Sequence, residues 1–218
     1  MSSTEQYDGV SISVGALELD SNTLAGVFFF ALAAQFMTVI MLAAAMVPGY
    51  DFSASAISDL GVAPETALLF NLSLIVAGLL NVAGGYFFYR SHGARWLVGL
   101  FTVAGLGIVG VGLFPLDTGG LHSLFALVAF LFVNLQALGT ATKLDGVMRA
   151  VSALAGLLGL AFVVLMAIGD AGNAAAFGPI GHGGTERMIV YPVMLWLVAF
   201  GGYLLGSHGP EPDIETSP

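Results

Sequence analysis

The sequence predicts an all-α protein, a polytopic transmembrane helical bundle with six spans. Of its 218 residues only 9% are charged and 57% are hydrophobic, whereas a soluble domain carries about 25% charged residues. The mean hydropathy is +0.93. Six apolar runs are each long enough to cross a hydrocarbon core, which takes about 20 helical residues. Together they use nearly the whole chain, so no separate soluble domain is expected.

The expected spans are separated by breaks rich in glycine, proline and polar residues. Their expected bounds are 23–47, 65–89, 95–115, 121–141, 147–169 and 187–206. The fourth run is the weakest, because Asn134 and Gln136 interrupt it. The longest break, 172–184, predicts a glycine-rich loop before the sixth span. We therefore divide the chain into an acidic N-terminal tail (1–22), a six-helix transmembrane domain (23–206) and an acidic C-terminal tail (207–218).

The basic residues predict the orientation in the membrane. An even number of spans puts both tails on one side, which also holds Arg90, Arg95, Lys143 and Arg149. The opposite side holds Arg187. Because cytoplasmic loops carry the excess of Lys and Arg, we expect a multi-pass protein of the cell membrane with both termini in the cytoplasm.

The composition narrows the classes of partner. A formal charge of −9 disfavours nucleic acid, and the absence of cysteine removes thiol chemistry and disulfides. Membrane lipids are the expected partners. Small residues at helix-contact spacing, such as Ser152 with Gly156, favour close packing, either inside the bundle or in a homo-oligomer or membrane complex. The single lysine and the acidic tails suggest a halophilic archaeon as the source, although a plain disordered acidic tail explains them equally well.

Ionisable residues are excluded from the middle third of every expected span, which disfavours a proton-coupled carrier or pump. They gather instead where the spans should meet the outer face. Together with one amide they form a candidate pocket for a lipid headgroup or a small polar ligand: Asp59, Asn71, Asp117, His122, Glu186 and Arg187. The structural alternative is a scaffold or subunit of a membrane complex, in which these residues cap helices and Arg187 forms an ion pair with Asp59, Asp117 or Asp170.

A metal site is a further hypothesis for the same face. His122, His182 and Asp117 have the ligand chemistry for zinc, which would activate a water for hydrolysis of a lipid. Asp117 and His122 are five residues apart across a glycine-rich turn, so they complete no known ligand motif. Ser58 with either histidine would make a hydrolase dyad, but no nucleophile-elbow sequence surrounds it. No other cofactor is expected, and the catalytic residues of any enzyme here stay unknown.

Several short motifs follow one another in a characteristic order. They are Ser58-Asp59-Leu60-Gly61, Phe70-Asn71, the run from Gly110 to Asp117, then His122 and Glu186-Arg187. In this order the chain resembles domain of unknown function family 998, a group of prokaryotic membrane proteins. The resemblance implies a multi-helix membrane bundle and brings no established activity. It also implies a His-Gly-x-x-His pattern, in which Thr118 here replaces the first histidine.

Overall fold

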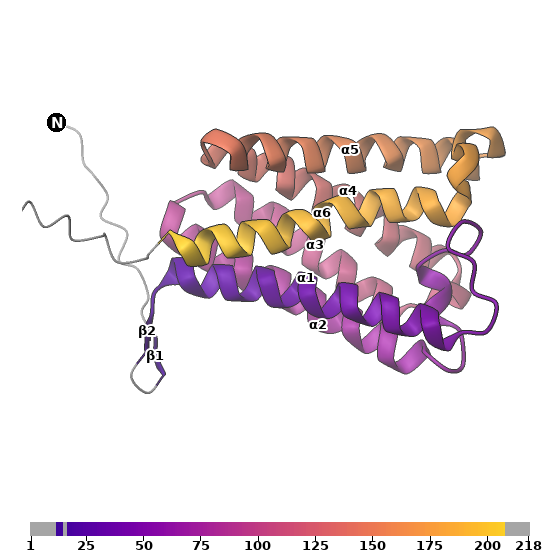
Figure 1. The fold of residues 1–218 in the computed structure, drawn as a ribbon, viewed down its shortest axis with the longest axis horizontal. Coiled ribbons are helices and arrows are strands. Elements are labelled where there is room, and N and C mark those ends of the chain that lie inside the picture. Colours follow the sequence, from indigo (N-terminus) through magenta and orange to yellow (C-terminus); the bar gives the residue numbers. More distant parts are fainter. Residues whose placement is uncertain (1–11, 15–16, 208–218) are drawn as a thin grey trace, which may run out of the picture.

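The structure, a computed structural model, describes residues 12–14 and 17–207 and contains six long helices in one bundle (Figure 1). A small antiparallel hairpin of β1 (Ile12–Val14) and β2 (Leu17–Leu19) precedes them. The helices are α1 (Ser21–Met46), α2 (Ala67–His92), α3 (Arg95–Leu113), α4 (Gly120–Thr140), α5 (Gly146–Asp170) and α6 (Gly181–Gly206). All six are long and apolar enough to cross a membrane, which confirms the predicted all-α transmembrane bundle.

The helices form a ring in which each one packs against the next in sequence. α6 closes the ring, because it packs against both α5 and α1 and also touches α4. In Figure 1, α1 and α6 lie side by side, with α5 along one edge. The side-chain amide of Asn22 donates to the carbonyl of Leu204 at 2.9 Å, so the start of α1 and the end of α6 lie at the same end. We call this the terminal end, and the opposite one the outer end.

Most helix bounds agree with expectation to within three residues, and α6 is the exception. Its first residue is Gly181 rather than 187, so the end of the predicted glycine-rich loop, residues 181–184, belongs to α6 and follows the 3₁₀ helix η4 (Ala174–Ile180). The expected start was wrong because glycine at 183 is needed for packing against the α1–α2 connection, as described below. Of the two expected tails, 1–11, 15–16 and 208–218 lie outside the described residues.

The run predicted to be weakest, α4, is one continuous helix whose polar residues face other helices. Asn81 of α2 and Gln136 of α4 exchange two amide hydrogen bonds of 3.0 Å each. The amide of Asn134 donates to the carbonyl of Ile189 in α6 at 3.3 Å. Hydrocarbon offers no partners for such groups, so pairing between helices is what makes them tolerable inside a bundle.

The interior differs between the two halves of the bundle. Near the terminal end, five buried aromatic side chains are in ring contact: Phe29, Phe88, Phe101, Trp196 and Phe200. Toward the outer end, the same interior contains a cavity of about 60 Å³. The half beside the termini is therefore packed with aromatic rings, and the cavity lies in the outer half.

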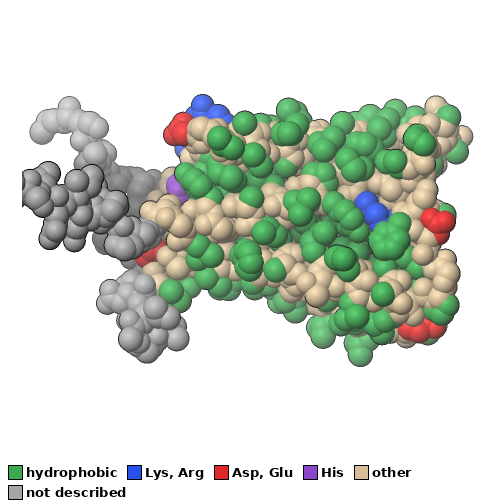
Figure 2. All heavy atoms as spheres, viewed as in Figure 1, with side chains coloured by type: hydrophobic (Ala, Val, Ile, Leu, Met, Phe, Trp, Pro, Cys, Tyr) green, Lys and Arg blue, Asp and Glu red, His purple; other side chains and the backbone are tan. Residues whose placement is uncertain are grey.

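The outside of the bundle is apolar along most of its length. Figure 2 shows hydrophobic side chains over the helices and charged side chains toward the two ends. Leu68, Leu154 and Leu195 are 82%, 66% and 61% exposed. Such exposure suits a hydrocarbon environment and would be unfavourable in water.

Close packing of α5 on α4 gives a first testable prediction. A Cβ at Gly159 would overlap the side-chain amide of Asn134, so Gly159→Ala should lower the stability by about 1–3 kcal/mol. This would be seen as a lower thermal midpoint in detergent. The matched control is Gly99→Ala in α3, where a Cβ would meet nothing within 4 Å. An equal loss in both variants would contradict the predicted role of Gly159.

Candidate functional site

The connection between α1 and α2, residues 47–66, folds over the outer end of the bundle. Two neighbouring residues of α6, Glu186 and Arg187, hold it in place. Both are buried, at 5% and 6% exposure. They lie in the second turn of α6, not at its first residues as the sequence suggested, and this places their side chains inside the structure.

Arg187 binds the carbonyl side of the connection. Its Nη1 donates to the carbonyls of Phe52 and Ser55, each at 2.8 Å, and to that of Gly183 in its own helix. Its Nη2 donates to the hydroxyl of Tyr50 at 2.7 Å. The guanidinium carbon lies 4.8 Å from the centroid of the Phe52 ring, a cation–π contact. Carbonyl dipoles and ring faces thus surround the buried charge.

The ion pair expected for Arg187 is not formed. Within the described part of the chain, Arg149 forms an ion pair with Asp145, and His182, which is charged only when protonated, lies 3.3 Å from Asp170; neither pair involves Arg187. A planar guanidinium with five donors suits several carbonyls at once. The prediction of a carboxylate partner was therefore wrong.

Tyr50 and Asp51 shape the start of the connection. The Tyr50 hydroxyl accepts from Arg187 and donates to the carbonyl of Ala56 at 2.6 Å. Burial raises the pKa of Tyr50 to about 12, against an opposing effect of Arg187, so the hydroxyl keeps the proton it donates. The Asp51 carboxylate accepts from the N–H groups of Ala54 and Ser53, and these bonds lower its pKa.

Gly183 allows the connection to approach α6. Its N–H donates to the carbonyl of Ser53 at 2.8 Å. A Cβ at this position would overlap the carbonyl oxygen of Ser55 and lie 2.8 Å from Nη1 of Arg187. The glycine-rich stretch at the start of α6 is therefore the surface that contacts the connection. The sequence-based prediction treated these glycines as loop residues and did not include this contact.

Glu186 binds the amide side of the same connection. Its carboxylate accepts from the N–H of Ile57 at 2.5 Å and also from the N–H of Ser58. These amides begin the short 3₁₀ helix η1 (Ser58–Gly61), where backbone N–H groups have no partner inside the helix. Glu186 therefore caps η1 from another helix.

Asp59 and Asn71 complete the connection and do not face a cavity. The Asp59 carboxylate accepts from the N–H of Ala56 at 2.8 Å. The side-chain amide of Asn71 donates to the carbonyl of Gly61 at 2.9 Å. Both predicted site residues therefore stabilise the backbone of the connection.

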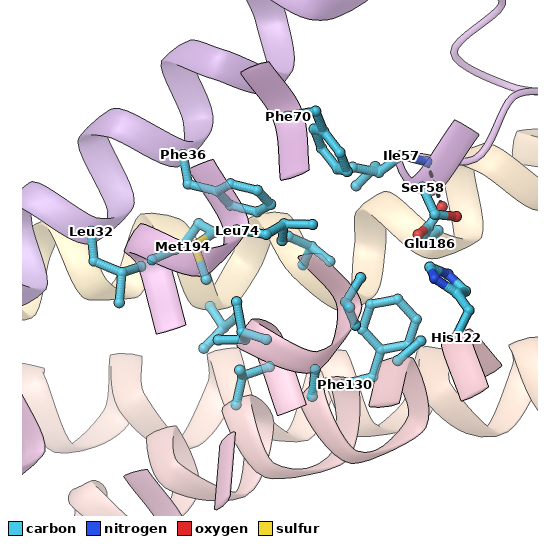
Figure 3. A pocket seen from close by; sticks show the side chains of 18 residues that line it. Leu32, Phe36, Ile57, Ser58, Phe70, Leu74, His122, Phe130, Glu186 and Met194 are labelled. Carbon is cyan, nitrogen blue, oxygen red and sulfur yellow. Dashed lines mark hydrogen bonds between the residues drawn. The ribbon is translucent and has the colours of Figure 1, made fainter. Parts of the chain in front are cut away.

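Two cavities adjoin beneath this connection. The first, of about 60 Å³, lies in the centre of the bundle and is apolar apart from one end, where Ser58, His122 and Glu186 meet (Figure 3). The second, of about 220 Å³, lies between α4, α5 and α6 and is lined by the same three residues. Ala126 and Phe130 of α4 also border both cavities.

His122 has a defined hydrogen-bonding state. Its Nδ1 lies 2.9 Å from the carbonyl oxygen of Phe114. A carbonyl can only accept, so Nδ1 carries the hydrogen, and in the neutral form of the ring Nε2 presents a lone pair. In Figure 3 the imidazole lies next to the Glu186 carboxylate. The side chain is 5% exposed and borders both cavities.

Of the six residues predicted for a ligand pocket, the structure brings His122 and Glu186 together at the cavities. Asp59, Asn71 and Arg187 hold the connection, and Asp117 lies exposed on η2 (Leu116–Thr118). Ser58 was considered only as part of a dyad, but it borders both cavities. The roles of Tyr50 and Phe52 were not predicted from the sequence. Two aromatic residues flanking an aspartate, just after the first apolar run, were the available signal.

The residues of the proposed metal site are not assembled. His182 Nε2 lies 3.3 Å from an oxygen of Asp170 at the rim of the larger cavity. Across residues 12–14 and 17–207, no three His, Cys, Asp or Glu side chains are grouped so as to hold a metal ion. His122, His182 and Asp117 are therefore not grouped as metal ligands within these residues.

Comparison with known proteins identifies a family. The profile of the family described as "Protein of unknown function (DUF998)" matches residues 24–203, which include most of the six-helix bundle. Neither a curated protein nor a solved structure matches the chain significantly. The resemblance seen in the order of the motifs is thereby confirmed.

The contacts of Arg187 predict the effect of a conservative substitution. Lysine keeps the charge but cannot span the two carbonyls and the Tyr50 hydroxyl. Arg187→Lys should therefore cost about 2–4 kcal/mol, since bonds to charged groups contribute about 1.5–3 kcal/mol each. The matched control is Arg149→Lys, at an exposed ion pair with Asp145, where less than about 1 kcal/mol is expected. Equal thermal midpoints for the two variants in detergent would refute the proposed role of Arg187.

Proposed function

Since the chain belongs to the family of proteins of unknown function DUF998, its activity must be inferred from its own site, and we propose that this multi-pass membrane protein binds a small amphiphilic ligand at its outer end. The polar part of the ligand would contact Ser58, His122 and Glu186. Its apolar part would occupy the larger cavity. A lipid headgroup with part of its chain and a small membrane-soluble molecule both have this chemistry.

One observation carries the proposal: Ser58, His122 and Glu186 line both of the adjoining cavities, and the other residues that line them are mostly apolar. Ligand sites are typically apolar concavities with a few convergent polar groups. The larger cavity, of about 220 Å³, exceeds the ~150 Å³ of an engineered apolar cavity that binds benzene. It therefore has room for a chain of several carbons.

The larger cavity also reaches the lateral surface of the bundle. Leu127 and Leu116 line it and are 53% and 37% exposed. Leu127 lies on α4, two turns from the outer end, on a surface that hydrocarbon would cover. This placement supports access from the membrane itself, as a poorly water-soluble ligand requires.

The competing proposal is a scaffold or subunit of a membrane complex, in which the cavities are packing defects. Well-packed interiors contain few voids larger than a water molecule. The larger cavity, of about 220 Å³ and lined in part by His122 and Glu186, is much larger than such voids, so a packing defect alone does not account for it. Lipid hydrolysis with a metal gains no support, because no metal-binding group occurs among the described residues.

We further propose that the site faces the outside of the cell membrane and that both termini are cytoplasmic. Arg90 and Arg95 flank the α2–α3 connection, Lys143 lies in the α4–α5 connection and Arg149 in the first turn of α5, all at the terminal end, and an excess of basic residues favours the cytoplasm. Single cysteines at Ser91 and Ala175 test this. An impermeant thiol reagent added to whole cells should label Ala175→Cys and spare Ser91→Cys, and the reverse pattern would invert the orientation.

A variant that fills the cavities tests the binding proposal. Ala126 borders both of them, so Ala126→Phe should block a ligand without removing a polar group. The probes are six-carbon diazirines with a hydroxyl, amine or carboxylate head, applied to protein in lipid nanodiscs. Carbene insertion at Met166 and Ala167, which line the larger cavity, should fall at least about tenfold, corresponding to about 1.4 kcal/mol.

The matched control is Ala161→Phe, at an exposed position of α5 that borders neither cavity. It should leave the insertion at Met166 unchanged. If Ala126→Phe and Ala161→Phe give the same labelling as the wild type with all three probes, the cavities bind no amphiphile, and the scaffold proposal is favoured.

A further inference from the structure

We infer that the polar group of the ligand is a hydrogen-bond donor, an aliphatic amine or alcohol, rather than a phosphate or carboxylate. This inference rests on the proposed function and specifies its ligand class. It follows from the charge of the polar groups that face the two cavities, and from whether each of these groups donates or accepts hydrogen bonds.

The floor of the cavities is rich in acceptors. The Glu186 carboxylate has about four lone-pair positions, and two backbone N–H groups use part of this capacity. His122 donates through Nδ1 to Phe114, so the ring in its neutral form offers the Nε2 lone pair. The Ser58 hydroxyl can donate or accept. A group that donates one to three hydrogen bonds therefore complements this floor.

The described residues that line the cavities include no lysine or arginine, and their two histidines, His122 and His182, are positive only when protonated. Arg187 is the next residue after Glu186, but its Nη1 and Nη2 donate to Tyr50, Phe52, Ser55 and Gly183. Its guanidinium is therefore committed to the connection above the site.

An anionic head would meet an unfavourable environment here. Phosphate and carboxylate sites in proteins commonly use Arg or Lys side chains, and Arg often binds in bidentate contact. At pH values where Glu186 is ionised, its carboxylate would oppose such a ligand, in a partly apolar surrounding that strengthens the repulsion. At the rim, Asp170 adds a second carboxylate, 3.3 Å from the His182 imidazole.

An ammonium and a hydroxyl share the donor chemistry but differ in charge. An ammonium supplies three donors and a positive charge that would pair with Glu186. A hydroxyl supplies one donor and one acceptor, which suits Glu186 or His122 together with Ser58. The competition experiment below therefore includes one amine and one alcohol.

The test is competition between four ligands that share a six-carbon chain: hexylamine, 1-hexanol, hexanoate and hexyl phosphate. Each is titrated, at pH 8 and in nanodiscs of zwitterionic lipid, against labelling of Met166 by the hydroxyl diazirine. Hexylamine or 1-hexanol should protect at concentrations at least about tenfold lower than hexanoate and hexyl phosphate. Protection by hexanoate or hexyl phosphate at equal or lower concentration would overturn the inference.

The outcomes separate this inference from the proposal beneath it. Anion-selective protection that Ala126→Phe abolishes would keep the binding site and reject its donor preference. Absence of protection by all four compounds, with labelling insensitive to Ala126→Phe, would reject both.

Glu186→Gln gives a second measurement. Glutamine can still accept at the connection but removes the charge, so the ratio between hexanoate and hexylamine should shrink severalfold. An unchanged ratio would argue against Glu186 as the selecting group. The wild-type competition remains decisive if this variant does not fold.

Discussion

The structure depends on two adjacent residues of α6 that hold the α1–α2 connection in place. One of them binds backbone carbonyl groups of the connection, and the other binds its backbone N–H groups. Arg187 satisfies carbonyls at Phe52 and Ser55, and Glu186 satisfies the N–H groups of Ile57 and Ser58. Backbone polar groups at the edge of an apolar bundle need such partners, because unpaired buried groups are costly. The same contacts account for burying a carboxylate and a guanidinium, since each has hydrogen-bonding partners in the backbone.

This arrangement also explains why the outer half of the bundle can remain hollow. The connection lies over the cavities and is fixed from α6, so the space beneath it does not need to be filled by side chains. At the terminal end, where Asn22 on α1 bonds to Leu204 on α6, the interior is filled by aromatic rings such as Phe29 and Phe200.

The bundle could be predicted from the sequence because hydrocarbon imposes a length on each apolar run and excludes charge from its centre. The same exclusion correctly brought His122 and Glu186 to one end. The start of α6 was missed because the reason for Gly183 is a contact with Ser55, 128 positions away in the chain. The partners of Arg187 were missed because every residue has a backbone carbonyl, so the sequence does not indicate which carbonyls an arginine binds. Aspartates such as Asp59 and Asp117 are visible in the sequence and were therefore predicted as partners.

The most direct test of whether α6 holds the connection is hydrogen–deuterium exchange at the Ile57 amide, measured at single-residue resolution in nanodiscs. Its N–H is bonded to the Glu186 carboxylate, so exchange should be slow in the wild type and fast in Glu186→Ala. Amides in the centre of α4, around Gln136, should stay slow in both proteins. An Ile57 amide that already exchanges at the unprotected rate in the wild type would contradict the account, because the connection would then not be held by α6.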